Sequence, residues 1–329
     1  MKVIVTGGSG FVGTNVVEDY LSRGCDVSSI DLEQPRNPAH LPVWSRLDIR
    51  NGDDLDRAFR TFSPDVIVHL AARTDLDGTS LADYSANTDG VKNVIAAAKR
   101  LPNPRRVIFA SSMLVCALGY RPKTDTDYSP TTTYGESKVL SEEFVRAYAA
   151  GSFPWTIVRP TSLWGPWFGV PYRGFFDAVA KRLYVHPAKR RIVRSDGFVL
   201  NSVHQLNRIA TSSDRALLDQ KMLYLADYEP VELYHWACLI SAAFGVPRPP
   251  EVPLPLLRVA ARAGDVLKRA GVRNPPLTSF RLNNLLTDAV FDMEPLSAVA
   301  GTTPYSVAQG VAITAAWMRS GQLPRDPAR

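Results

Sequence analysis

The 329-residue chain is 45% hydrophobic and 21% charged, as expected for a soluble globular protein with one large domain, or one domain and a smaller lobe. Its net charge of +6 comes from residues 181–194, which hold six basic residues and no acid. This local patch argues for an anionic ligand there, and against binding of a polyanion across the whole surface. Three distant cysteines without a CxxC pair and five histidines without ligand spacing argue against disulfides and zinc, so we expect no metal and a reducing compartment.

The first half of the chain alternates apolar runs with helical patterns. The predicted strands are residues 2–6, 26–30, 65–70, 106–110 and 155–159, and the predicted helices are residues 11–23, 52–62, 82–99 and 133–149. Such alternation implies parallel strands joined by right-handed crossovers. We therefore expect an α/β fold with a Rossmann-type doubly wound parallel sheet.

Beyond Pro160 the pattern becomes irregular. Prolines punctuate an aromatic-rich stretch, so regular strands are not expected there. A strand near residues 222–226 and a helix over 231–244 are expected to rejoin the sheet. A later amphipathic helix, residues 256–270, has a basic polar face suited to a membrane surface, but packing of its Leu/Val face within a lobe is the favoured interpretation. No stretch is long enough to span a bilayer.

A glycine-rich turn follows the first predicted strand and opens the first helix. Gly7 permits the tight turn, Gly10 lets the backbone approach a pyrophosphate, and Gly13 lets helix and strand pack closely. The free N–H groups at the helix N-terminus favour bound phosphate. This order of strand, turn and helix predicts a dinucleotide site.

Acidic residues at the ends of the next two strands specify the dinucleotide. Asp31 is placed to accept hydrogen bonds from an adenosine ribose diol, and its charge would repel a 2′-phosphate. NAD is therefore expected rather than NADP, and Arg36 is the nearby cation that would soften this preference. Asp48 and Ile49 end a further expected strand, which comes third in the chain before the helix 52–62. An acid and an apolar residue commonly bracket adenine at this place.

Tyr134 and Lys138 lie four residues apart on one face of the predicted helix 133–149. A tyrosine is a poor base at neutral pH because its unperturbed pKa is about 10. A nearby ammonium and the positive charge of oxidised nicotinamide both favour the phenolate. Ser112, just past the strand 106–110, would hydrogen-bond the same substrate oxygen. The three residues predict hydride exchange with an alcohol or ketone carbon, with Tyr134 as the base.

These motifs resemble those of the extended short-chain dehydrogenase/reductases, and among them the NAD-dependent nucleotide-sugar epimerases and dehydratases. The resemblance covers nearly the whole chain and rests on the glycine turn, Ser111-Ser112, Tyr134 with Lys138, and the segments 69–72, 159–166 and 303–317. It implies a Rossmann domain, a smaller mixed C-terminal substrate lobe, and often a homodimer built from the helices near 82–99 and 133–149. We expect residues 1–165 to form the NAD-binding domain, with the sheet completed by about 198–228, and residues 166–197 and 229–329 to form the lobe.

The resemblance also implies a set of contacts. The expected cofactor contacts are Gly7, Gly10, Phe11, Val12, Gly13, Asp31, Asp48, Ile49, Leu70, Ala71, Ala72, Asn87, Tyr134, Lys138 and Pro160. The expected substrate contacts are Thr74, Ser162, Trp164, Tyr172, Arg191 and Arg194, with Trp167 and Phe168 as further candidates for the pocket wall.

One departure from the family pattern narrows the reaction. Family dehydratases carry an Asp-Glu pair directly after the catalytic Ser or Thr, whereas this chain has Met113-Leu114. Related decarboxylases place a Glu near here, and 3,5-epimerase/reductases place a Cys. Neither Met113 nor Leu114 can protonate a leaving hydroxyl, so redox chemistry at one carbon remains: epimerisation at C4, or simple oxidation and reduction.

Other departures concern the substrate. Ser162 stands where sugar-nucleotide enzymes usually have an Asn that contacts the diphosphate, and Asn201-Ser202 replaces acids of the family pattern. Arg191 and Arg194 would hold a diphosphate in its place, but a solvated basic loop is an equally good interpretation.

The leading hypothesis is a cytoplasmic, NAD-dependent nucleotide-sugar epimerase. The first alternative is an NAD-dependent dehydrogenase or reductase of a hydroxysteroid, lipid or other secondary alcohol, which the apolar residues 254–267 favour. A non-catalytic NAD-binding protein is the second alternative, and the complete Ser112, Tyr134 and Lys138 set argues against it.

Overall fold

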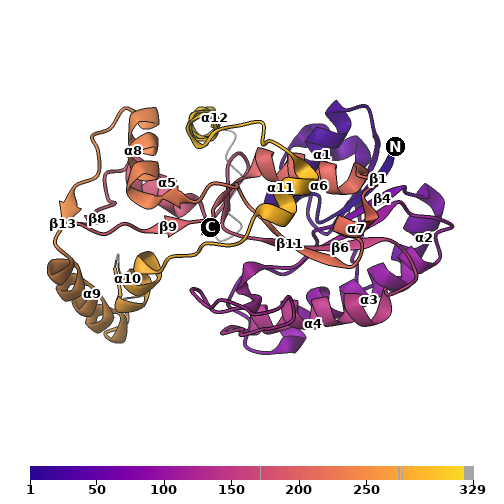
Figure 1. Cartoon of the computed structure of the whole chain (residues 1–329), viewed down its shortest axis with the longest axis horizontal. Helices are drawn as coiled ribbons and strands as arrows, with labels where there is room; N and C mark the ends of the chain where they lie inside the picture. Colours follow the sequence, from indigo (N-terminus) through magenta and orange to yellow (C-terminus); the bar gives the residue numbers. More distant parts are fainter. Residues whose placement is uncertain (171, 273–274, 276, 322–329) are drawn as a thin grey trace.

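A computed structural model describes residues 1–170, 172–272, 275 and 277–321. Its centre is a seven-stranded sheet in the order β11-β6-β5-β4-β1-β2-β3, and every neighbouring pair is parallel (Figure 1). The strands are β1 (Lys2–Thr6), β2 (Asp26–Asp31), β3 (Trp44–Arg46), β4 (Val66–His69), β5 (Arg106–Ala110), β6 (Trp155–Pro160) and β11 (Lys221–Leu225). The predicted Rossmann-type fold is confirmed.

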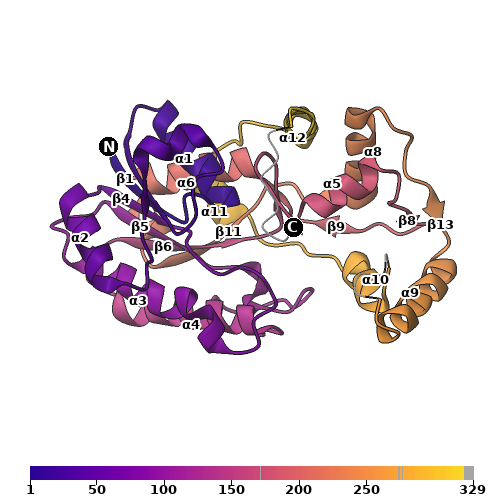
Figure 2. The same ribbon diagram turned by 180° about the vertical axis from the view of Figure 1, so that it is seen from behind.

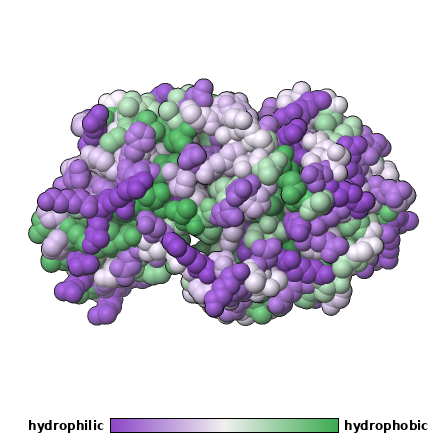
Figure 3. Space-filling view, viewed as in Figure 1, coloured by the Kyte–Doolittle hydropathy of each residue, from purple (hydrophilic) through white to green (hydrophobic). Residues whose placement is uncertain are grey.

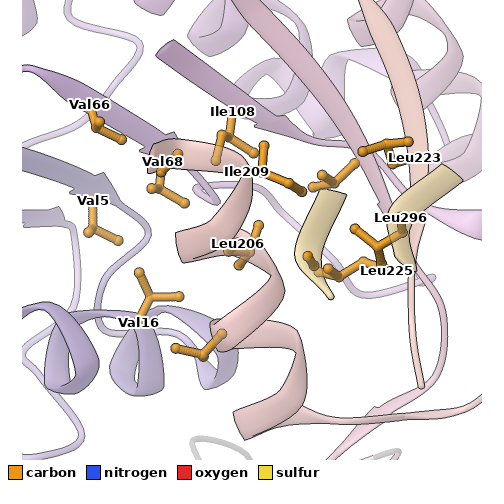
Figure 4. Packing of buried hydrophobic residues seen from close by; sticks show 14 of the residues in the cluster. Val5, Val16, Val66, Val68, Ile108, Leu206, Ile209, Leu223, Leu225 and Leu296 are labelled. Carbon is orange, nitrogen blue, oxygen red and sulfur yellow. The ribbon is translucent and has the colours of Figure 1, made fainter. Parts of the chain in front are cut away.

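Alternation along the strands divides the core into two layers. Val3 and Val5 of β1 pack on one face of the sheet, and Ile4 between them packs on the other. The first layer is covered by α1 (Phe11–Ser22), α6 (Val199–Thr211) and α11 (Glu294–Ala300), whose side chains meet the strands in Figure 4. The second is covered by α2 (Gly52–Phe62), α3 (Ser85–Lys99) and α4 (Thr133–Tyr148).

A second group of short elements extends from the carboxyl edge of the sheet (Figure 2). It contains α5 (Arg173–Ala180), β8 (His186–Pro187), β9 (Val193–Arg194), β12 (Val231–Glu232), α8 (Leu233–Phe244), β13 (Glu251–Val252), α9 (Leu254–Arg269), α10 (Ser279–Leu286) and α12 (Val307–Arg319). An aromatic cluster that includes Trp164, Phe176 and Trp236 forms its core. β7 (Leu163–Trp164) pairs with β10 (Gly197–Phe198). Shorter helical turns are η1 (Pro38–Val43), η2 (Leu81–Tyr84), η3 (Met113–Val115) and α7 (Arg215–Leu218).

The sequence predicted most elements of the sheet but not all placements. β3 ends at Arg46, so Asp48 and Ile49 follow the strand instead of ending it. Helix α8 forms where a helix was predicted, but it packs on α5 and α12, so the expectation that it rejoins the sheet was wrong. Helix α6, which the sequence did not predict, covers the sheet instead. No helix within the described ranges is both long enough and apolar enough to cross a membrane.

Candidate active site

The structure brings Ser112, Tyr134 and Lys138 together at the carboxyl edge of the sheet. Ser112 precedes η3, two residues beyond the end of β5. The Lys138 Nζ donates a 2.9 Å hydrogen bond to the carbonyl of Ala110, the last residue of β5. Tyr134, one turn earlier on α4, lies close enough to Ser112 for the serine hydroxyl to lower the pKa of its phenol. All three side chains are at least nine-tenths buried.

Gly135 permits this close approach of α4 to η3. A Cβ at this position would lie 2.3 Å from the carbonyl oxygen of Leu114, so any side chain would push the helix away. The Thr132 hydroxyl caps α4 by accepting a 3.0 Å hydrogen bond from the Gly135 N–H. The start of α4, and with it the position of Tyr134 beside Ser112, is therefore fixed locally.

The phenol of Tyr134 holds its proton tightly in the protein alone. Burial raises its pKa, the hydrogen bond with Ser112 lowers it, and the neighbouring phenols of Tyr172 and Tyr84 raise it further. The Tyr84 ring lies 6.0 Å from the Tyr134 ring, centroid to centroid. In this state Tyr134 is suited to donate a proton to a carbonyl oxygen. To act as a base it needs an additional positive charge nearby.

Lys138 is buried next to a neutral histidine. Burial lowers the pKa of Lys138 to about 8, and the Glu142 carboxylate one turn along α4 opposes that shift. Burial lowers the pKa of His69 to about 3, and the Lys138 charge contributes to the decrease. The neutral His69 ring forms a 2.7 Å hydrogen bond with the Thr6 hydroxyl at the end of β1. Lys138 is thus charged at neutral pH but close to losing its proton.

A buried ionic network supports this side of the site. One oxygen of the Glu142 carboxylate accepts hydrogen bonds from Arg159 Nε at 2.8 Å and from the Ser111 hydroxyl at 2.6 Å. The other oxygen accepts from Arg159 Nη2 at 2.9 Å and from the Tyr128 hydroxyl at 3.0 Å. Arg159 also donates to the carbonyl of Asp125 at 2.6 Å. Glu142 and Arg159 are 1% and 0% exposed, respectively. The network ties α4 to β5 and β6 directly behind Lys138.

The glycine turn forms a cradle that fits a pyrophosphate. Gly7 has a φ of +76°, and a Cβ on it would lie 2.5 Å from the Ala71 nitrogen. A Cβ on Gly13 would lie 2.0 Å from the Gly7 carbonyl oxygen. At Gly10 the nearest atom would be 3.2 Å away, so its outer side remains open at the N-terminus of α1. The backbone thus closes tightly on the sheet and leaves room where phosphates would sit.

Asp31 lies beside this cradle at the end of β2. Its carboxylate accepts hydrogen bonds from the backbone N–H groups of Ser9 at 3.0 Å and Glu33 at 3.1 Å. Burial raises its pKa. Arg36 lies within electrostatic reach of Asp31 and donates a hydrogen bond to the carbonyl of Trp167. Arg36 is therefore engaged with the backbone of the following lobe.

The other predicted cofactor residues surround this edge, some in supporting roles. Asp48 is paired with Arg50 at 2.6 Å, and Ile49 packs on Gly90 of α3. The Asn87 amide is committed to both backbone groups of Arg73 and to the Ser137 hydroxyl, so it braces the loop after β4. The other predicted cofactor contacts on that edge are partly buried: Phe11, Val12, Leu70, Ala71, Ala72 and Pro160.

On the lobe side, Tyr172 lies within electrostatic reach of Tyr134, and Ser162 neighbours the buried Asp196. The Tyr172 side chain is 45% exposed, yet burial of its hydroxyl end and the charge of Asp196 raise its pKa. Tyr172 in turn raises the pKa of Tyr134, so its phenol lies within electrostatic reach of both groups. Burial raises the pKa of Asp196 to about 6, while Arg194 and a hydrogen bond with Ser162 oppose the shift. A buried carboxyl group therefore lies within electrostatic reach of Tyr172.

Several predicted substrate contacts lie elsewhere. Trp164 is 2% exposed and packs between Phe198 and Trp236, so it belongs to the aromatic core and not to a pocket wall. Phe168 is likewise fully buried. Arg194 donates to the backbone carbonyls of Asn284 and Leu285. The remaining predicted contacts, Thr74 and Arg191, are exposed.

Four residues near the site were not predicted to belong to it. Glu142 had a usable signal, because it continues the four-residue spacing of Tyr134 and Lys138 along α4. Tyr84, Asp196 and Asp227 gave none, since they come from short turns and strands far apart in sequence. Asp227 follows β11, and its carboxylate accepts hydrogen bonds from Asn201 at 2.8 Å and the Phe198 N–H at 3.1 Å. Burial raises its pKa to about 6.

A Rossmann-type sheet, a glycine cradle on its first helix and a Ser–Tyr–Lys group at the adjacent strand end define the class, an NAD-dependent enzyme. The chain belongs to the NAD dependent epimerase/dehydratase family, whose model matches residues 3–197. NAD is the cofactor of this family.

Known proteins that are similar to the chain have different activities. A 3-beta-hydroxysteroid dehydrogenase of Mycolicibacterium neoaurum is 30% identical over 282 residues, which are 79% of this chain and 73% of the relative. An Escherichia coli O157:H7 4-epimerase, of N-acetyl-alpha-D-glucosaminyl-diphospho-ditrans,octacis-undecaprenol, is 23% identical over 94% of this chain and 93% of its own. The structure of the UDP-glucose 4-epimerase of Thermus thermophilus with NAD aligns with a TM-score of 0.71 at 22% identity, covering 98% of this chain and 100% of its own.

Proposed function

We propose that the protein is an NAD-dependent dehydrogenase or reductase that acts on a secondary alcohol of an uncharged, largely apolar substrate. The observation that carries this proposal is the set of groups near Tyr134. The Tyr172 phenol lies within electrostatic reach of both Tyr134 and the buried carboxyl of Asp196. An acid in this position disfavours a diphosphate. The 30% identity with a hydroxysteroid dehydrogenase supports the same substrate class.

The residues of the chain have distinct roles in this reaction. NAD would supply a hydride acceptor for the alcohol carbon in its oxidised form and a hydride donor in its reduced form. The cradle of Gly7, Gly10 and Gly13 would hold its pyrophosphate and Asp31 its ribose diol. The nicotinamide ring of oxidised NAD is positively charged, and together with the Lys138 ammonium it would favour the Tyr134 phenolate.

The proton moves at a single oxygen. In oxidation the Tyr134 phenolate takes the proton of the substrate hydroxyl, and in reduction the phenol returns it to the carbonyl oxygen. The Ser112 hydroxyl donates a hydrogen bond to that oxygen, and partial negative charge there is stabilised when it develops. Lys138 stays protonated throughout and supplies charge without transferring a proton to the substrate.

A second candidate function is the epimerase that the sequence placed first, acting at C4 of a nucleotide sugar or a lipid-linked sugar. The 4-epimerase from Escherichia coli O157:H7 that aligns along nearly the whole chain supports it. For this candidate Arg191 and Arg194 would hold the diphosphate. Arg194 would then have to give up its hydrogen bonds to the α10 carbonyls.

One experiment separates the two candidates. Purified protein is incubated with NAD and either a panel of hydroxysteroids and long-chain secondary alcohols or a panel of nucleotide sugars. The proposal predicts NADH formation with members of the first panel and no stereochemical change in the second. Epimerised sugar without NADH formation would reverse the order of the candidates.

We further propose a homodimer formed through α3 and α4, as the family resemblance implies. A partly exposed aromatic stack on α4 supports it: Phe144 and Tyr148 lie 5.9 Å apart, and Tyr148 is 51% exposed. The proposal predicts twice the chain mass by light scattering, with dissociation in Tyr148→Glu. A monomeric wild type would contradict it.

A further inference from the structure

Helix α9 carries an apolar stripe that faces away from the protein. Leu256, Val259 and Val266 are 61%, 64% and 61% exposed. Their spacing of three and seven residues places them on one side of the helix. The same stripe includes Ala260, Ala263 and Leu267, all exposed. In the space-filling view, hydrophobic atoms appear among hydrophilic ones at the lower left margin, where Figure 1 shows α9 (Figure 3).

This stripe is not the face that packs α9 into the protein. Leu254, Leu257 and Ala261 are buried against Leu282 of α10. Gly264 continues the buried face, and a Cβ on it would lie 1.7 Å from the Leu277 carbonyl oxygen. The lobe packing predicted from the sequence is therefore real, but it uses only one of two apolar stripes. Folding of α9 does not explain the second.

Basic residues flank the outer stripe along one side. Arg258, Arg262 and Arg269 are exposed and share a narrow sector of the helix next to the apolar residues. The only acid of α9, Asp265, accepts a hydrogen bond from the Ser279 N–H at 3.1 Å. Phe280, on the adjacent α10, is 73% exposed. A helix with an exposed apolar stripe and a cationic border has the pattern of an interfacial helix.

We propose that the outer face of α9 docks the enzyme onto the surface of a membrane that contains anionic lipids. The apolar side chains would enter the boundary between headgroups and acyl chains, and the three arginines would contact the phosphates. α9 has 16 residues and five charged side chains, so it would lie along the surface and not cross it. This inference goes beyond the proposed function and is independent of which alcohol is the substrate.

The charge pattern favours lipid over a second copy of the chain. An antiparallel two-fold contact through α9 would bring Arg258, Arg262 and Arg269 close to the same arginines of the other copy. Such like-charge contacts are unfavourable, whereas anionic headgroups neutralise them.

Hydrogen bonds link α10, on which α9 packs, to the segment that contains Asp196. Val193 donates a 2.8 Å hydrogen bond from its N–H to Asp288, just beyond α10, and Arg194 binds the α10 carbonyls. Asp196, which lies within electrostatic reach of Tyr172, is two residues further along the same segment. A membrane-bound α9 would therefore hold the substrate lobe close to a reservoir of apolar alcohols.

The test is flotation of the NAD-loaded enzyme with vesicles of phosphatidylcholine alone, or of phosphatidylcholine mixed with phosphatidylglycerol. We expect binding to the mixed vesicles only. The triple variant Leu256→Ser, Val259→Ser, Val266→Ser should bind at least about tenfold more weakly, as should Arg258→Gln, Arg262→Gln, Arg269→Gln. The matched control, Leu41→Ser with Leu217→Ser, changes side chains that are 46% and 42% exposed elsewhere and should bind as wild type.

Separate readouts keep the outcome interpretable. All variants should retain the NAD affinity and thermal unfolding of wild type, because the changed side chains are exposed. The proposal is overturned if wild type ignores both kinds of vesicle, or if the α9 variants float as well as the control. It is also overturned if the serine variant loses self-association in light scattering but still binds vesicles, because a second copy would then be the occupant. None of these outcomes depends on turnover, so they leave the proposed function to its own test.

Discussion

Replacing Glu142 by Gln tests the ionic network behind the candidate active site. The change keeps the size of the side chain and removes one negative charge from a position that is 1% exposed. Arg159, itself fully buried, then loses the negative charge of its partner and one of the two acceptors of its hydrogen bonds at 2.8 and 2.9 Å, because the amide nitrogen of Gln cannot accept. Removing one member of a buried pair costs about 3–5 kcal/mol because the other charge stays buried without compensation.

The same change lowers the pKa of Lys138. Groups one helical turn apart are separated by about 6 Å, and two unit charges at that distance interact by about 2.8 kcal/mol at an effective dielectric constant of about 20. Since Arg159 already offsets part of the Glu142 charge, we expect about half of this, or roughly one pKa unit. Starting from about 8, Lys138 then begins to lose its charge near neutral pH.

Two assays follow, with Glu143→Gln as the control because Glu143 is the exposed next residue of α4. Urea unfolding should show a loss of about 3–5 kcal/mol for Glu142→Gln and little change for the control. The alkaline limb of the pH–activity profile should move to lower pH by about one unit, because turnover requires the Lys138 ammonium. Equal stability of the two variants, or an unmoved alkaline limb, would refute the reasoning.

Further predictions concern individual groups. Tyr134→Phe should abolish nearly all turnover while NAD affinity in calorimetry stays close to wild type, and substantial remaining activity would rule out Tyr134 as the base. Asp31→Ala should weaken NAD binding by roughly 1–3 kcal/mol and relax the rejection of NADP; tighter binding of NADP than NAD by wild type would show that Arg36 dominates. Changing Arg191 and Arg194 to Ala should alter KM for an apolar alcohol little, whereas a large rise confined to sugar nucleotides would favour the epimerase.

The parallel sheet could be predicted because its strands are local, continuous apolar runs. Residues 2–6 and 106–110 match β1 and β5 in full, and the glycine turn marks where α1 begins. Helix α6 was missed although Val199, Val203, Leu206 and Ala210 recur at helical spacing. The surface that this apolar face covers is shown only by its packing on the sheet.

Some residues of the candidate site could also be predicted from the sequence, and others could not. Ser112, Tyr134 and Lys138 lie on contiguous elements, so their spacing predicted their meeting. Asp196 lies beside Ser162 only because β7 pairs with β10, a contact between two-residue strands that leaves no periodic signal. Trp164 was expected in a pocket wall and packs in the aromatic core, a difference that the sequence does not show, because an aromatic residue in a loop-rich segment looks the same in both places.

The central claim is net hydride transfer to NAD from an apolar secondary alcohol. Its most direct test is the absorbance of NADH together with the amount of ketone formed, measured with the hydroxysteroid and long-chain alcohol panel. The account predicts one NADH per ketone, accumulating with time in wild type and absent in Tyr134→Phe. Turnover of a sugar epimer with no accumulation of NADH, and no ketone from any alcohol, would contradict it.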